Sequence, residues 1–171
     1  MSIHSLHRTA AFAGLVIFAS VVAPVQARAQ DGGIAVGAHA PTAMVHSLEG
    51  KPLDLSSVIG KGPAVIEFWA TWCPNCKELE PTIMAAERKY AGRVKFVTVA
   101  VAVNESAERV RRHAAAHKMT QTVVYDAVGK AADVYDAPAT SYVVVLDRTG
   151  RVVYTGVGGT QNLDAAIRKA L

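Results

Sequence analysis

The two cysteines of the chain lie where a buried strand is followed directly by a helix. Residues Ala64–Trp69 form an almost continuous run of apolar, strand-forming residues, which is the pattern of a strand buried on both faces of a sheet. The next segment, Cys73–Tyr90, is long enough for a helix, and apolar residues recur along it in steps of three and four: Cys76, Leu79, Ile83, Ala86 and Tyr90. This junction predicts both thiols in the first turn of a helix that packs on a buried strand.

The rest of the chain continues the alternation of strands and helices. The pattern predicts an N-terminal hairpin turning at Leu48–Lys51, a second buried strand over 94–101, a helix from Asn104 or Ser106 to about His117, a hairpin of 142–146 and 151–155, and a last helix from Thr160 or Asn162 to Leu171. Strands that alternate with helices favour an α/β fold, with a central mixed sheet flanked by helices on both faces.

Composition narrows the classes of protein that remain. A length of 171 residues favours one domain with its own core. The charge of 18 Lys and Arg against 14 Asp and Glu, without basic runs, argues against nucleic acid as a partner. Two cysteines are too few for a disulfide-stapled miniprotein or for a four-thiolate zinc site.

The N-terminal segment has the pattern of a secretory signal. A short, weakly basic start is followed by the uncharged run Thr9–Val25 and by the small-residue site Ala27–Ala29. We therefore predict a signal peptide over 1–29 that is cleaved after Ala29, a flexible lead-in over 30–36 and a folded domain over 37–171. An uncleaved membrane tether is the alternative, although the apolar run is shorter than a membrane span. The cleaved protein is expected in the periplasm or otherwise exported.

The spacing Cys73-Pro74-Asn75-Cys76 indicates redox chemistry. Two thiols separated by two residues at a helix N-terminus can form a disulfide, and the helix dipole stabilises a thiolate at Cys73. Since Cys76 belongs to the buried helical face, Cys73 is predicted to be the accessible nucleophile and Cys76 the shielded resolving thiol. A structural disulfide and half of a metal site are the alternatives. His113 and His117 have ligand spacing, but we interpret them as a solvated helix face and predict no metal site.

The region Ala64–Pro81, with Phe68-Trp69-Ala70-Thr71-Trp72 before the two cysteines, resembles the active-site region of the thioredoxin superfamily. The stretches 36–56 and 144–150 are similar to those of the TlpA/ResA-like exported thiol-disulfide oxidoreductases. This resemblance implies a thioredoxin-like fold with an N-terminal β-hairpin. It also implies a monomeric reductase of protein disulfides, for example in cytochrome c or copper-site maturation. The only redox group would be the Cys73–Cys76 disulfide, and a membrane electron donor of the thiol-transfer type would recharge it. A metallochaperone that binds copper through the two thiolates, with Met84 or a histidine, is the alternative.

Glu67 stands in the centre of the apolar strand, six residues before Cys73. In thioredoxin-like proteins the matching position often holds a buried acid. Burial should raise its pKa, so the resemblance implies that Glu67 exchanges a proton with Cys76. The alternative is a strand-edge residue whose carboxylate reaches water.

The resemblance also implies a substrate-binding surface around the cysteines, formed by Trp72, Pro74, Asn75, Pro138, Thr140 and Ser141. Related proteins carry a cis-proline opposite the cysteines, and the spacing back from the turn Asp147–Gly150 favours Ser141 over Pro138 at that place. Such a serine would add a donor and a hydroxyl near the Cys73 sulfur and lower the Cys73 pKa. Leu79 stands where some ResA-like reductases carry an acid, which weakens the transfer of their specific partner to this chain.

Overall fold

The computed structural model describes residue 1 and residues 32–171 of the chain. The expected signal segment and its cleavage site therefore lie outside the described residues, apart from Met1. The described elements are β1 Met44–His46, β2 Pro52–Asp54, α1 Leu55–Ile59, β3 Ala64–Trp69, α2 Pro74–Lys89, β4 Lys95–Val101, α3 Ala107–Ala116, β5 Thr122–Asp126, α4 Lys130–Val134, β6 Tyr142–Leu146, β7 Val152–Val157 and α5 Leu163–Arg168. Among these residues no helix is both long and apolar enough to cross a membrane.

The strands form one mixed sheet in the order β2-β1-β5-β4-β3-β6-β7. The pairs β3–β4 and β4–β5 are parallel, and the remaining neighbours are antiparallel. The central strand β3 is buried along its whole length, as its unbroken apolar run predicts. This arrangement is a thioredoxin-like α/β fold with the N-terminal hairpin β1–β2, and it confirms the predicted fold class.

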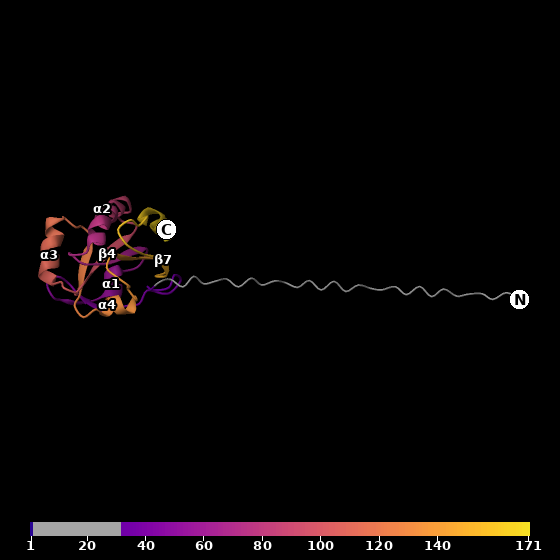
Figure 1. Ribbon diagram of the computed structural model, residues 1–171, viewed down its shortest axis with the longest axis horizontal. Helices are drawn as coiled ribbons and strands as arrows, with labels where there is room; N and C mark the ends of the chain where they lie inside the picture. Colours follow the sequence, from indigo (N-terminus) through magenta and orange to yellow (C-terminus); the bar gives the residue numbers. More distant parts are fainter. Residues whose placement is uncertain (2–31) are drawn as a thin grey trace.

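Two apolar clusters cover the two faces of the sheet. Side chains of α2 and α5 pack on Val65, Val143 and Val145, whereas side chains of α1 and α4 pack on the opposite face, around Ile66 and Val144. Figure 1 shows α1 and α4 together on one side of the sheet and α2 on the other. The predicted buried face of α2 is confirmed, because Cys76, Leu79, Ile83 and Ala86 are its buried residues.

The sequence pattern missed β5 and α4. The run Thr122–Asp126 contains two valines and a tyrosine, which are strand-forming residues, and it pairs in parallel with β4. The helix α4 has five residues and begins after Gly129, whose φ of 74° is left-handed. A helix of five residues is too short for an apolar period to be recognised. Together they extend the sheet beyond β4 and carry the chain to the segment before β6.

The folded domain begins earlier than the predicted boundary at residue 37, because Ile34 already contacts it. The Ile34 amide donates hydrogen bonds to the Tyr135 carbonyl at 3.0 Å and to the Tyr142 hydroxyl at 2.9 Å. The Ile34 side chain packs against the core cluster that includes Tyr135. These contacts hold the N-terminal end of the described region against the end of α4 and the start of β6.

Candidate active site

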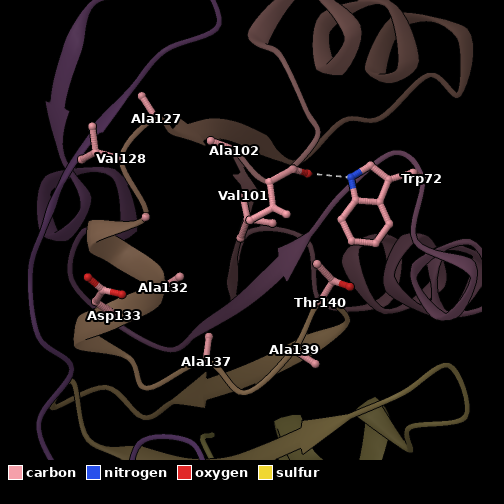
Figure 2. A pocket seen from close by; sticks show the side chains of 12 residues that line it. Trp72, Val101, Ala102, Ala127, Val128, Ala132, Asp133, Ala137, Ala139 and Thr140 are labelled. Atoms are coloured by element: carbon pink, nitrogen blue, oxygen red, sulfur yellow. Dashed lines mark hydrogen bonds between the residues drawn. The ribbon is translucent and has the colours of Figure 1, made fainter.

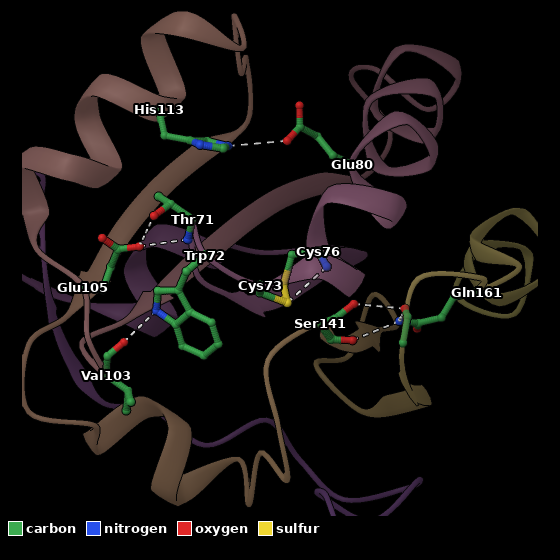
Figure 3. The surroundings of a disulfide bond; sticks show 11 residues. Thr71, Trp72, Cys73, Cys76, Glu80, Val103, Glu105, His113, Ser141 and Gln161 are labelled. Atoms are coloured by element: carbon green, nitrogen blue, oxygen red, sulfur yellow. Dashed lines mark hydrogen bonds and ion pairs between the residues drawn. A yellow bond between two sulfur atoms is a disulfide. The ribbon is translucent and has the colours of Figure 1, made fainter.

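The cysteines form a disulfide at the N-terminus of α2, with 5.3 Å between their Cα atoms. Cys73 is the N-cap residue, and its Sγ accepts a hydrogen bond from the Cys76 amide at 3.1 Å. Pro74 occupies the first turn, where its missing amide hydrogen costs nothing, and no acidic residue lies in that turn. After reduction, the free amides and the helix dipole would therefore favour a thiolate at Cys73. Figure 3 shows the disulfide at the start of this helix.

Burial does not distinguish the two cysteines in the oxidised protein. Cys73 is 2% exposed and Cys76 is 4% exposed. The sequence pattern placed only Cys76 among buried residues, so the expectation that Cys73 is the exposed thiol is not met in this state. The cause is the capping conformation, because the Cys73 side chain turns back over the first helical turn instead of pointing into solvent. The neighbouring Pro74 and Asn75 are exposed.

Glu67 is the one acidic residue within the central strand β3. It is 5% exposed, and its backbone pairs with Thr98 of β4 and Val143 of β6. Side chains alternate along a strand, so Glu67 shares a face with Val65, which packs against α2. Burial, and then the negative charge of Glu80, raise the pKa of Glu67 to about 8. Near pH 7 the carboxyl is therefore mostly neutral, with a smaller ionised fraction, so it can exchange a proton close to that pH.

Ser141 precedes β6 directly and lies beside the disulfide in Figure 3. Its φ of 65° is left-handed, which is unusual for a residue with a side chain. Its amide donates to the Phe68 carbonyl at 2.8 Å, and its hydroxyl donates to the Gly158 carbonyl at 3.0 Å. Its own carbonyl accepts a hydrogen bond from Gln161 Nε2 at 3.0 Å. No peptide bond among residues 32–171 is cis.

These contacts show that the Ser141 amide and hydroxyl do not have the role expected for them, which was to donate to the Cys73 sulfur. The amide and the hydroxyl were expected to be available near the Cys73 sulfur, but both donate to carbonyls of the protein. The left-handed backbone causes this, because it directs the amide toward β3 and the hydroxyl toward the segment after β7. Pro138 is exposed and lies against Gly32, where an added Cβ would be 3.0 Å from the Pro138 Cβ.

A largely apolar cavity of about 720 Å³ lies beside Trp72. Thr140 lines it from the segment before β6, and the other lining side chains come from the end of β4, the loop after it, and the region of α4. Figure 2 shows the Trp72 indole at one end of this cavity. Trp72 is 43% exposed, and its Nε1 donates to the Val103 carbonyl at 2.8 Å, so the indole has a fixed orientation.

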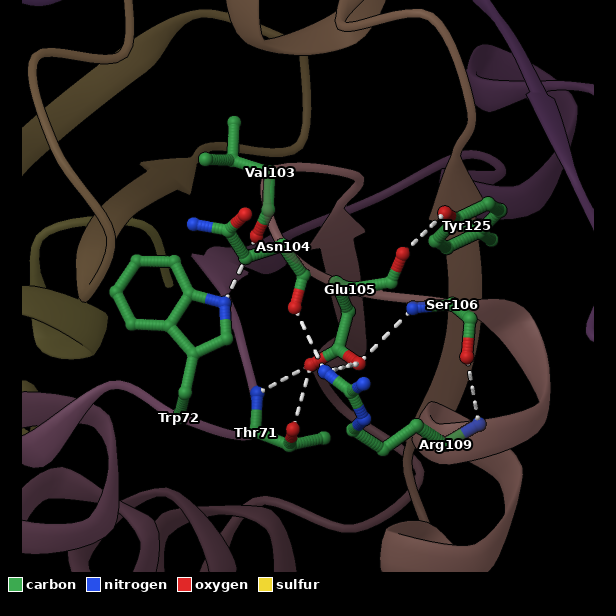
Figure 4. A network of polar contacts seen from close by, with 8 residues as sticks. All are labelled: Thr71, Trp72, Val103, Asn104, Glu105, Ser106, Arg109 and Tyr125. Atoms are coloured by element: carbon green, nitrogen blue, oxygen red, sulfur yellow. Dashed lines mark hydrogen bonds and ion pairs between the residues drawn. The ribbon is translucent and has the colours of Figure 1, made fainter.

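Glu105 holds the loop before Cys73 in place, and the sequence analysis missed it. Its buried carboxylate accepts hydrogen bonds from the Thr71 amide at 2.8 Å and the Thr71 hydroxyl at 2.6 Å. The same carboxylate accepts from the Ser106 amide at 3.0 Å and lies 3.6 Å from the Arg109 guanidinium. Figure 4 shows how this network joins the β3–α2 loop to the start of α3. An acid before a helix is common at caps, so the sequence gives no signal of the contact with Thr71.

The sequence pattern suggested that His113 and His117 form a solvated helix face, but only His117 is exposed, whereas the His113 side chain is mostly buried. Both rings turn toward Glu80 of α2, and His117 Nδ1 lies 2.7 Å from Glu80 Oε1. The His113 ring also packs against Trp69, with 5.1 Å between ring centroids. Burial, and then the neighbouring His117, lower the pKa of His113. The spacing of four residues places both rings on the face of α3 that meets α2.

Comparison with known proteins gives consistent matches. Residues 35–171 match the Redoxin family. The chain is 30% identical over 130 residues to the thioredoxin-like protein YneN of Bacillus subtilis, covering 75% of each chain. It is 31% identical over 125 residues to the thiol-disulfide oxidoreductase ResA of Bacillus subtilis, covering 73% of this chain and 69% of ResA.

Solved structures share the fold at lower identity. A secreted disulfide oxidoreductase of Mycobacterium tuberculosis superposes with a TM-score of 0.62 at 22% identity, covering 75% of this chain and 94% of that chain. StoA from Bacillus subtilis superposes with a TM-score of 0.58 at 23% identity, covering 74% of this chain and 95% of StoA. The Cys73–Cys76 disulfide at the N-terminus of α2 therefore stands in a fold that other disulfide-exchanging proteins share.

Proposed function

Because this chain belongs to the Redoxin family and is a thiol-disulfide oxidoreductase of the thioredoxin fold, we propose that it is an exported reductase of protein disulfides. The observation that carries the proposal is the Cys73–Cys76 disulfide at the N-terminus of α2, which becomes a dithiol on reduction. The reducing direction is what the resemblance to the TlpA/ResA-like proteins implies, since a strong oxidant owes its high potential to an unusually stabilised reduced form.

The reaction uses the reduced form of the pair. The Cys73 thiolate attacks one sulfur of the substrate disulfide, forming a mixed disulfide and releasing the other substrate sulfur as a thiolate. Cys76 then loses its proton and attacks the Cys73 sulfur, which releases the second substrate thiolate and leaves the Cys73–Cys76 disulfide. The substrate gains two electrons and the dithiol loses two. The ionised form of Glu67 accepts the proton of Cys76 in the second step, and a pKa of about 8 leaves a fraction of the carboxyl in that form near neutral pH.

Protein substrates are favoured over small thiols by the surface around the cysteines. Trp72 offers an exposed ring with a fixed orientation beside Cys73, and the cavity next to it has a largely apolar lining. Pro74 and Asn75 are exposed, and Thr140 forms part of the opposite wall. An extended peptide that carries a disulfide can contact all of these groups at once. Cytochrome c and copper-site maturation are pathways that the resemblance to the TlpA/ResA-like proteins implies.

The expected segment 1–29 and the relatives support export. A secreted disulfide oxidoreductase shares the fold, and residues 1–29 carry the pattern of a signal peptide. An exported reductase needs a source of electrons, which we assign to a membrane donor of the thiol-transfer type. Fractionation of cells that express the full chain should place a species lacking residues 1–29 in the exported fraction. The full-length chain in the membrane fraction would favour a tether instead.

The proposed reaction is tested by mixing the reduced protein with a protein that contains a disulfide. The wild type should reduce it stoichiometrically, whereas Cys76→Ser should accumulate a mixed disulfide through Cys73, and Cys73→Ser should form none. Accumulation with Cys73→Ser instead would exchange the roles of the two thiols. If neither variant traps a substrate and the wild type reduces none, the reductase proposal is wrong.

A further inference from the structure

Three potential metal ligands meet between α2 and α3, outside the disulfide site. His113 and His117 lie one helical turn apart on α3, and their rings stack with 3.8 Å between centroids and 15° between planes. Glu80 of α2 faces both rings: Oε1 lies 2.7 Å from His117 Nδ1, and Oε2 lies 3.5 Å from His113 Nε2. One ligand atom from each residue can be chosen so that all three lie within 4.8 Å of one another. In Figure 3 His113 points across to Glu80.

The cluster of these three residues is buried on one side and exposed on the other. The His113 ring packs against Trp69 from the core, and its buried Nε2 makes no hydrogen bond, with Glu80 Oε2 facing it at 3.5 Å. The Glu80 side chain is mostly buried, while the His117 side chain is 41% exposed. A buried imidazole nitrogen without a partner costs free energy, and a bound cation would satisfy it.

We propose that Glu80, His113 and His117 form a binding site for a divalent transition metal ion, with Zn²⁺ as the best-fitting probe. Two imidazole nitrogens and one carboxylate oxygen are ligands that Zn²⁺ prefers, and such three-residue sites leave a fourth position for water. Tetrahedral Zn²⁺ with bonds of about 2.0–2.2 Å places neighbouring ligand atoms about 3.3 Å apart. The observed contacts of 2.7 Å to Oε1 and 3.5 Å to Oε2 involve different oxygens of Glu80, and the three chosen ligand atoms lie within 4.8 Å of one another, so the side chains would draw closer together around a bound ion.

The site would connect the redox helix to its neighbour. Glu80 lies four residues after Cys76 on α2, whereas His113 belongs to α3 and His117 is its C-cap, so one ion would cross-link the two helices. Binding to the folded chain alone stabilises it in proportion to the logarithm of the free metal concentration. The three ligands do not include either cysteine, so binding should occur in the oxidised protein. The alternative is a simple ion pair between Glu80 and His117 that binds no metal, and the experiment must distinguish it from a metal site.

The test is a calorimetric titration of the oxidised full chain with Zn²⁺. The chain contains six histidines, and His4→Ala with His7→Ala removes the two in the N-terminal segment. On this background we expect one equivalent of Zn²⁺ to bind. His117→Ala and Glu80→Gln should each weaken binding at least about tenfold. His39→Ala removes an exposed histidine elsewhere on the surface and should leave the affinity unchanged.

Thermal unfolding provides the second measurement. Saturating Zn²⁺ should raise the Tm of the oxidised parent and of His39→Ala, but not that of His117→Ala or Glu80→Gln. Both ligand variants should fold, because His117 is partly exposed and glutamine has the shape of glutamate. Mg²⁺ should not bind, since imidazole is a poor ligand for it. Absence of the one-equivalent binding, equal affinity in the ligand variants, or binding that requires reduction of Cys73–Cys76 would each overturn the proposal.

Discussion

Replacing Glu67 with glutamine should change how the stability of the oxidised protein depends on pH. The folded chain favours the neutral carboxyl, with a pKa of about 8 against an ordinary value of 4.5. Between these two pH values the unfolded chain has lost the proton that the folded chain still holds. Each pH unit therefore lowers the free energy of unfolding by about 1.4 kcal/mol. This contribution to stability is complete below pH 4.5, falls as pH rises and is lost above pH 8. The whole interval corresponds to about 5 kcal/mol.

Urea unfolding of the oxidised wild type and Glu67→Gln, measured at intervals between pH 5 and pH 9, tests this reasoning. The glutamine cannot ionise. As pH rises, the free energy of unfolding of the variant should therefore increase relative to that of the wild type by several kcal/mol. Other titrating groups contribute equally to both proteins and cancel. Parallel pH profiles would show that the Glu67 carboxyl is solvated, and its proposed role in proton transfer would then be withdrawn. In single-turnover assays, the same variant should slow resolution of the mixed disulfide without slowing attack by Cys73.

Further predictions concern the groups around the disulfide. Ser141→Pro should destabilise the protein by about 3 kcal/mol or more, because proline cannot adopt the left-handed φ and has no amide to donate to Phe68; urea unfolding within 1 kcal/mol of wild type would contradict this. Glu105→Ala should cost about 2–3 kcal/mol in the same assay by leaving the Thr71 donors unpaired, whereas Glu108→Ala on the exposed face of α3 should cost little. Limiting iodoacetamide should modify Cys73 before Cys76 in the reduced protein; peptide mapping that finds the reverse would reassign the nucleophile.

The parts of the fold that the sequence predicted are those with strong, local patterns. Strand β3 is buried on both faces, which leaves an unbroken apolar run, and the buried face of α2 repeats at helical spacing. The caps Ser106 and Asn162 were each one of two predicted candidates, and each accepts a hydrogen bond from a backbone amide of its helix. These features depend on neighbours in the chain, so they are visible without the tertiary structure.

The parts that the sequence did not predict depend on contacts between distant segments. Glu105 meets Thr71 only because the loop after β4 lies beside the loop after β3. The Ser141 hydroxyl points to Gly158, which depends on how β7 pairs with β6. The sequence pattern suggested that His113 is solvated, because charged residues flank it. Its ring instead packs against Trp69 of β3. No local pattern carries this information.

The equilibrium redox potential of the Cys73–Cys76 pair, measured against glutathione, tests the reductase proposal most directly. Because the resemblance to the TlpA/ResA-like proteins implies a reductant, we predict a potential well below the oxidase value of about −120 mV and closer to about −270 mV, where general reductants lie. A potential near −120 mV would contradict the proposal and assign the chain to disulfide formation.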